Sequence, residues 1–94
     1  MIRQYVAFGQ NMVFAIQDED WKEAKYLFED DPNCLFKRDC KTEEERKAYV
    51  DGIYDMGSRF GWCEVHALSK EEAAKLSKRI RLSEIPESEG YEGC

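Results

Sequence analysis

The fold signal is clearest in residues 41–68, KTEEERKAYVDGIYDMGSRFGWCEVHAL, which predict a capped helix followed by a turn and a strand. Thr42 suits the N-cap position, and Glu45 lies three residues later, where it completes a capping box. Apolar side chains then recur at spacings of four, three and four, which places them on one helical face. They are Tyr49, Ile53, Met56 and Phe60. Glycines follow, so we expect the helix to span 42–56 and a strand to span 62–68.

Two strands are predicted at the start of the chain. Residues 3–8 alternate with a two-residue period, so that Gln4 and Val6 share a face. Residues 12–17 also alternate, and because both of their faces are apolar we expect a central strand. The Gly-Gln-Asn sequence at 9–11 is typical of a turn. These features together predict a β-hairpin.

The same helix-start chemistry occurs twice more. Asp20 with Glu23 predicts the start of a helix that ends before Pro32, because a proline disfavours helical geometry in the residue before it. Ser69, with a glutamate three residues later, predicts the start of another helix. A short strand over 34–38 is expected between the first two helices.

The predicted order of elements is ββαβαβα, which indicates an α+β fold. We expect a three- or four-stranded sheet covered by helices on one face, with the strand order left open. The segment from 34 to 68, read as strand, helix and strand, is compatible with a right-handed βαβ crossover. Residues 1–82 are expected to form a single folded domain. Residues 83–94 lack an apolar period and are expected to form a flexible acidic tail.

Composition and charge narrow the class of protein. The 94 residues suffice for one modest core, and the apolar fraction of 43% indicates a folded chain. The net charge is −6, and the tail contributes four glutamates without any Lys or Arg. This acidic balance argues against nucleic acid as a partner. Neither a membrane-spanning stretch nor a signal peptide is predicted, so we expect a cytoplasmic protein with reduced cysteines.

The central stretch also carries a pattern of residues in a fixed order. They are Phe36, Thr42 to Tyr49, Gly52, Ile53, Gly61 and Trp62. With these residues, the region from about 36 to 62 resembles small uncharacterised α+β proteins encoded in bacterial genomes, phages and mobile elements. No enzymatic activity, cofactor or catalytic residue accompanies this resemblance.

Four residues are the candidates for metal-ligand and nucleophile chemistry. They are Cys34, Cys40, Cys63 and His66. A Cys₃His zinc site is chemically reasonable, but five residues separate the first two cysteines, which is wider than usual zinc motifs. Cys63 and His66 are three apart on a predicted strand, so they point to opposite faces. We therefore expect inert thiols, no metal and no cofactor, with a nucleophilic Cys63–His66 or Cys40–His66 pair as the enzymatic alternative.

Aromatic and acidic residues provide a different kind of candidate. Three tyrosines fall outside the main apolar stripes, where exposed tyrosine is typical of protein interfaces. Three consecutive acids lie at the predicted end of the first helix, where negative charge opposes the helix dipole. The predicted protein-binding residues are Tyr5, Tyr26, Tyr54, Glu29, Asp30 and Asp31.

These observations favour a small non-catalytic protein-binding or regulatory module. One form of this hypothesis is an inhibitor or accessory protein from a mobile element. The expected partner is another protein or a second copy of the chain, without nucleic acid and without a membrane. Two alternatives remain open: a small enzyme or ligand-binding protein that uses Cys63 and His66, and a zinc-stabilised domain.

Overall fold

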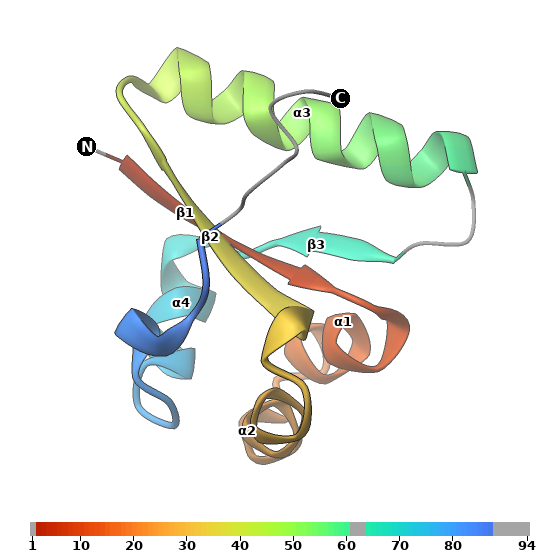
Figure 1. The fold of residues 1–94 in the computed structure, drawn as a ribbon, viewed down its shortest axis with the longest axis vertical. Helices are drawn as coiled ribbons and strands as arrows, with labels where there is room; N and C mark the ends of the chain where they lie inside the picture. Colours follow the sequence, from red (N-terminus) through yellow and green to blue (C-terminus); the bar gives the residue numbers. More distant parts are fainter. Residues whose placement is uncertain (1, 61–63, 88–94) are drawn as a thin grey trace.

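The computed structural model describes residues 2–60 and 64–87, and these residues form an α+β fold (Figure 1). The elements in chain order are β1 (Ile2–Phe8), α1 (Gln10–Gln17), α2 (Trp21–Asp30), the 3₁₀ turn η1 (Pro32–Cys34), β2 (Leu35–Cys40), α3 (Glu43–Phe60), β3 (Val65–Ala67), α4 (Lys70–Leu76) and the 3₁₀ turn η2 (Leu82–Glu84). The predicted α+β class is confirmed, whereas the predicted order of elements is not.

Within the described residues, the sheet has three strands in the order β2-β1-β3, and β1 pairs antiparallel with both neighbours. Val6 in the central strand lies opposite Phe36 of β2 and Ala67 of β3. The outer strands β2 and β3 therefore run parallel to each other, and α3 connects them. The predicted strand–helix–strand segment exists, but β1 lies between its two strands. A fourth strand is not found among the described residues.

The predicted strand over 12–17 is wrong, because these residues belong to helix α1. Gly9 initiates the helix with φ 98°, a backbone conformation that favours glycine, and its carbonyl accepts the amide of Val13 at 3.0 Å. The helix buries Met12, Val13 and Ile16. A continuous apolar run suits a strand or a buried helix equally, so alternation in this segment carried no information. The predicted β-hairpin is therefore also wrong, because it required a second strand at 12–17.

Residues 18–20 end one helix and begin the next. The amides of Glu19 and Asp20 donate to the carbonyls of Ile16 and Ala15, at 3.1 and 2.8 Å. This pattern is a Schellman motif, and Glu19 occupies its left-handed position with φ 58°. Asp20 then caps α2, because its carboxylate accepts the amide of Glu23 at 3.2 Å. The predicted cap at Asp20 is confirmed, although the helix before it was not foreseen.

The predicted helix over 42–56 is present and longer than expected. Its cap is confirmed, since the Thr42 hydroxyl accepts the amide of Glu45 at 3.1 Å. The helix continues past Gly57 to Phe60, because a glycine costs only about 1 kcal/mol relative to alanine inside a helix. The strand that follows is β3, which is shorter than the expected 62–68. Residues 61–63, where the turn and Trp62 were predicted, lie outside the described residues.

Helices cover both faces of the sheet, so the expectation of a single covered face is wrong. Figure 1 shows α1, α2 and α4 on one side of the sheet and α3 on the other. The physical reason lies in β1, where the neighbours Val6 and Ala7 point to opposite faces and both are fully buried. A strand that is apolar on both faces has to be covered twice.

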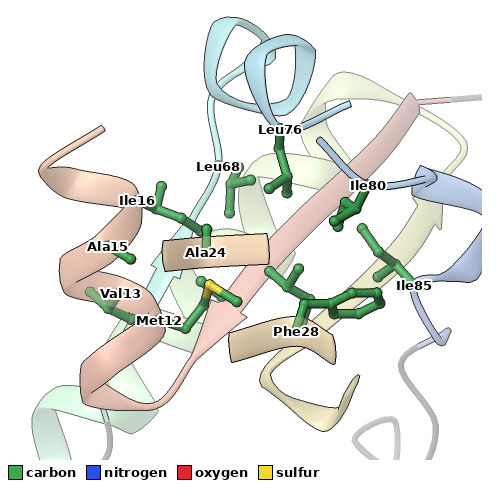
Figure 2. Packing of buried hydrophobic residues seen from close by; sticks show 12 residues of the cluster. Met12, Val13, Ala15, Ile16, Ala24, Phe28, Leu68, Leu76, Ile80 and Ile85 are labelled. Atoms are coloured by element: carbon green, nitrogen blue, oxygen red, sulfur yellow. The ribbon is translucent and has the colours of Figure 1, made fainter. Parts of the chain in front are cut away.

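The main core lies between the sheet and α1, α2 and α4 (Figure 2). Its members are Ala7, Met12, Val13, Ala15, Ile16, Ala24, Phe28, Leu35, Leu68, Leu76, Ile80 and Ile85. Leu76 is the last residue of α4, and Ile80 and Ile85 belong to the segments that follow it. Among the described helices, none combines the length and the apolar character needed to cross a bilayer.

The first part of the segment expected to be a flexible tail is packed against the body. Ile85 is 1% exposed and belongs to the main core. The carbonyl of Pro86 accepts the amide of Lys37 at 3.0 Å, and Glu87 forms a parallel bridge with the same residue of β2. A single isoleucine in a polar segment has no period, so only the folded chain reveals its burial. The remainder, 88–94, lies outside the described residues.

Candidate functional site

The structure does not bring the described cysteines together. Cys34 ends η1 and Cys40 ends β2, so the length of the strand separates them by about 17 Å. Both are free thiols. Cys63 lies outside the described residues. Within 2–60 and 64–87, no group of three or more His, Cys, Asp or Glu side chains is arranged to hold a metal ion.

Neither described cysteine is an activated nucleophile. Burial raises the pKa of the Cys34 thiol to about 11, and the negative charge of Asp31 acts in the same direction. Burial also raises the pKa of the Cys40 thiol. Both groups are therefore protonated at neutral pH, whereas nucleophilic attack requires the thiolate. The alternative catalytic pair of Cys40 with His66 gains no support from this environment.

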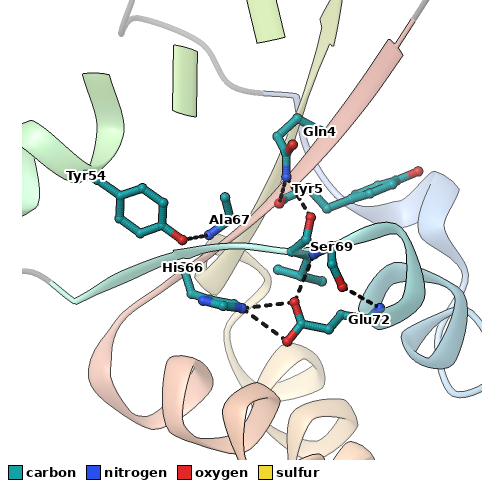
Figure 3. Close-up of polar contacts among 8 residues, drawn as sticks. Gln4, Tyr5, Tyr54, His66, Ala67, Ser69 and Glu72 are labelled. Atoms are coloured by element: carbon teal, nitrogen blue, oxygen red, sulfur yellow. Dashed lines mark hydrogen bonds and ion pairs between the residues drawn. The ribbon is translucent and has the colours of Figure 1, made fainter. Parts of the chain in front are cut away.

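His66 has a carboxylate partner from α4 (Figure 3). Its Nε2 lies 3.0 and 3.2 Å from the two carboxylate oxygens of Glu72. The same carboxylate accepts the amide of Ser69 at 2.8 Å, which completes the predicted capping box at the start of α4. Burial raises the pKa of Glu72, but the hydrogen bonds from Ser69 and His66 outweigh it and lower the pKa overall. His66 thus stabilises a helix start.

Gln4 is a polar residue that sequence reasoning assigned only to a strand face. Its side chain is 4% exposed, and its Nε2 donates to the carbonyls of Tyr5 and Leu68, each at 2.9 Å. Its Oε1 accepts Arg46 of α3 at 3.0 Å. A glutamine on an otherwise apolar strand face was the available signal, because buried amides require partners. Gln4 connects β1 to the end of β3 and to α3, so we assign it a structural role.

The three predicted tyrosines have different environments. Tyr5 is half-buried and packs against the main core. Tyr54 is 41% exposed, but its hydroxyl accepts the amide of Ala67 at 2.9 Å (Figure 3). This contact occupies a backbone amide of the edge strand β3, which is one way to protect a sheet edge. Tyr26 is 65% exposed, and its side chain forms no hydrogen bond or ion pair within the described residues.

The acidic residues at the end of α2 also separate into two groups. Asp31 caps η1, since its carboxylate accepts the amide of Asn33 at 3.1 Å. Glu29 and Asp30 are exposed, and their carboxylates have no partner in the part of the chain that the structure describes. They lie three and four residues after Tyr26, so all three share one side of the helix. We call Tyr26, Glu29 and Asp30 the α2 outer face.

A groove of ≈ 470 Å³ lies beside the α2 outer face. Its floor is formed by Phe28 and Ile80, which are 5% and 8% exposed. Residues of α2 and the segment 79–84 form the walls. The charged wall residues are Lys25, Glu29, Arg79, Arg81 and Glu84. We call this feature the end groove, and Glu29 belongs both to it and to the α2 outer face. Sequence reasoning did not find the groove, because its two walls are about fifty residues apart in the chain.

Comparison with protein-family models, with curated proteins and with solved structures gives no significant match. The resemblance of residues 36–62 to small proteins of bacteria, phages and mobile elements therefore stays a prediction.

Proposed function

We propose that the protein is a non-catalytic protein-binding module whose contact surface includes the α2 outer face. The observation that supports this proposal is the environment of Tyr26, which is 65% exposed on helix α2. Tyrosine is enriched at protein interfaces, where its ring contributes apolar area and its hydroxyl finds a partner. The exposed tyrosine ring can anchor a partner protein, and the two unpartnered carboxylates can pair with basic residues of that partner.

The two carboxylates add a second line of support. Glu29 and Asp30 occupy the last turn of α2, which contains no basic residue. Negative charge at a helix C-terminus is unfavourable by about 0.3–1 kcal/mol at an exposed site. A basic surface on a partner relieves this cost when it binds. The α2 outer face therefore suits a partner that presents lysine or arginine around an aromatic-binding hollow.

The wider proposal includes a cytoplasmic location and a role as an inhibitor or accessory protein of a mobile element. The raised pKa of Cys34 suits a protein with inert thiols. The partner is another protein or a second copy of this chain. An enzyme that uses His66 has less support, because the described contacts of His66 and Glu72 are those of a helix cap.

The test compares Tyr26→Ala with a matched control, Phe14→Ala. Phe14 is 45% exposed on α1, so its truncation removes a similar aromatic ring from a different surface. Partners are captured from a bacterial lysate, identified by mass spectrometry, purified and titrated against each variant. We expect Tyr26→Ala to weaken binding at least about tenfold, since aromatic hot spots contribute about 2 kcal/mol or more. The Phe14→Ala variant should bind like the wild-type chain.

Two outcomes are informative beyond this result. Sedimentation over a range of concentrations shows whether the captured partner is a second copy of the chain. Equal binding by the wild-type chain and Tyr26→Ala, with unchanged thermal stability, would remove the α2 outer face from the proposal.

A further inference from the structure

We propose that the end groove binds an acidic peptide segment that carries one apolar side chain. This inference rests on the proposed protein-binding function and names the chemistry of the segment that the partner inserts. It concerns a second surface, on the other side of Glu29 from Tyr26. The two proposals can therefore fail separately.

The groove has a small apolar floor between charged walls. Phe28 and Ile80 belong to the main core and retain 5% and 8% of their surface, and Figure 2 shows them close to Ile85 in the same cluster. The wall residues around them, Lys25 and Arg79 among them, are exposed. An open groove with a small apolar floor suits an extended chain that inserts one side chain, better than an enclosed small molecule.

The charge of the walls identifies the occupant as acidic. Arg79 and Arg81 flank the buried Ile80, and Lys25 contributes a third cation from α2. None of these three side chains forms a hydrogen bond or ion pair within the described residues. The two carboxylates of the groove, Glu29 and Glu84, leave a positive balance on a chain whose net charge is −6. A guanidinium group is suited to a carboxylate, which it can bind through two parallel hydrogen bonds.

The same carboxylates disfavour a nucleic acid. Glu29 and Glu84 lie on opposite walls, so a phosphate chain that follows the groove meets negative charge on both sides. A peptide can place a single carboxylate at Arg79 and Arg81 while its backbone amides approach the glutamates. The acidic segment is therefore preferred over the phosphate backbone on the basis of the groove's own charges.

The experiment titrates the full ¹⁵N-labelled chain with a blocked five-residue peptide that contains one leucine and one glutamate among glycines. Three further titrants are a peptide with lysine in place of the glutamate, a peptide with glycine in place of the leucine, and inorganic phosphate. Amide shifts locate the binding surface. We expect shifts around Lys25, Glu29 and residues 79–84 with the leucine–glutamate peptide, and roughly tenfold weaker binding by the other two peptides.

A matched pair of double variants tests the role of the cations. Arg79→Gln with Arg81→Gln should weaken peptide binding roughly tenfold, because both guanidinium groups are lost. Lys41→Gln with Lys47→Gln removes the same charge from exposed positions outside the groove and should leave binding unchanged. Circular dichroism verifies that both variants remain folded.

The outcomes separate this inference from the proposed function. Absence of shifts at the groove, shifts elsewhere, or equal binding by the Arg79→Gln, Arg81→Gln variant would overturn the groove assignment. Phosphate binding as tight as peptide binding would indicate an anion site and would also overturn it. Either result leaves the Tyr26 test intact, because that test uses a different surface and a captured partner.

Discussion

The two faces of the sheet are covered by different kinds of contact. The face toward α1, α2 and α4 carries the main core, in which Ile16, Leu35 and Leu76 are fully buried. The face toward α3 is covered by one helix, and none of the α3 side chains described over 43–55 is buried. Several of the contacts there are polar. Gln4 accepts Arg46, Tyr54 accepts the amide of Ala67, and the Arg38 guanidinium lies 4.9 Å from the centre of the Tyr49 ring.

This difference indicates which part of the molecule opens first. Apolar burial stabilises by about 25 cal/mol per Å², whereas a typical hydrogen bond contributes about 1 kcal/mol net. A helix held by half-buried side chains and a few polar contacts therefore separates at a lower free energy than the core. We expect α3 to exchange its amide hydrogens faster than α1 and α2.

The largest expected effect compares one aliphatic side chain from each face. Leu76→Ala should lower the free energy of unfolding by about 2–5 kcal/mol, because Leu76 is fully buried. Ile53→Ala should lower it by about 1 kcal/mol, because Ile53 on α3 is only half-buried. Urea denaturation of the two variants measures both values. Equal costs would show that α3 packs as tightly as the core.

An intermediate effect is expected at the polar connection between the sheet and α3. Gln4→Leu leaves the carbonyl of Leu68 and the guanidinium of Arg46 without their amide partner, so we expect a loss of about 1–3 kcal/mol. Gln17→Leu, an exposed glutamine at the end of α1, should change stability by less than about 0.5 kcal/mol. Hydrogen exchange should accelerate in α3 and at the end of β3, and not in α1 or α2. Equal acceleration in α1 and α2 would contradict a local role.

The smallest effect concerns the edge of β3. Tyr54→Phe removes the acceptor for the amide of Ala67, but Tyr54 is 41% exposed, so water can replace the hydroxyl. We expect a loss of about 0.5–1.5 kcal/mol. Tyr26→Phe is the matched control, since the Tyr26 hydroxyl has no partner within the described residues. A thermal melt that moves equally in both variants would exclude the edge contact.

Local chemistry explains the elements that were predicted correctly. Asp20, Thr42 and Ser69 each cap a helix through an amide only three residues away, so neighbouring residues suffice for the prediction. The alternation of β1 is similarly local. Segment 12–17 was misassigned because its apolar run fits the period of a strand as well as that of a helix. The helix begins after Gly9, which lies outside that run and occupies the N-cap position.

The exposure of some candidate residues could be predicted from the sequence. Tyr26 was identified from its position outside the apolar stripe, Glu29 and Asp30 from their negative charge at the end of a helix, and the structure leaves all three exposed on one helical side. Tyr54 also fell outside that stripe, but its contact with Ala67 depends on how α3 crosses β3. The end groove depends on the approach of segment 79–84 to α2, which no pattern in either segment indicates.

The sequence by itself therefore determined the starts of α2, α3 and α4, the strand β1 and the acidic, aromatic character of the chain, because these properties depend on residues within one turn or one strand. Only the tertiary structure decided that the sheet is covered on both faces, that Ile85 is buried, and that Gln4 bonds Leu68 across 64 positions. The physical reason is the distance along the chain over which each interaction acts. Capping and alternation act between near neighbours, whereas burial and buried hydrogen bonds depend on the arrangement of the whole chain.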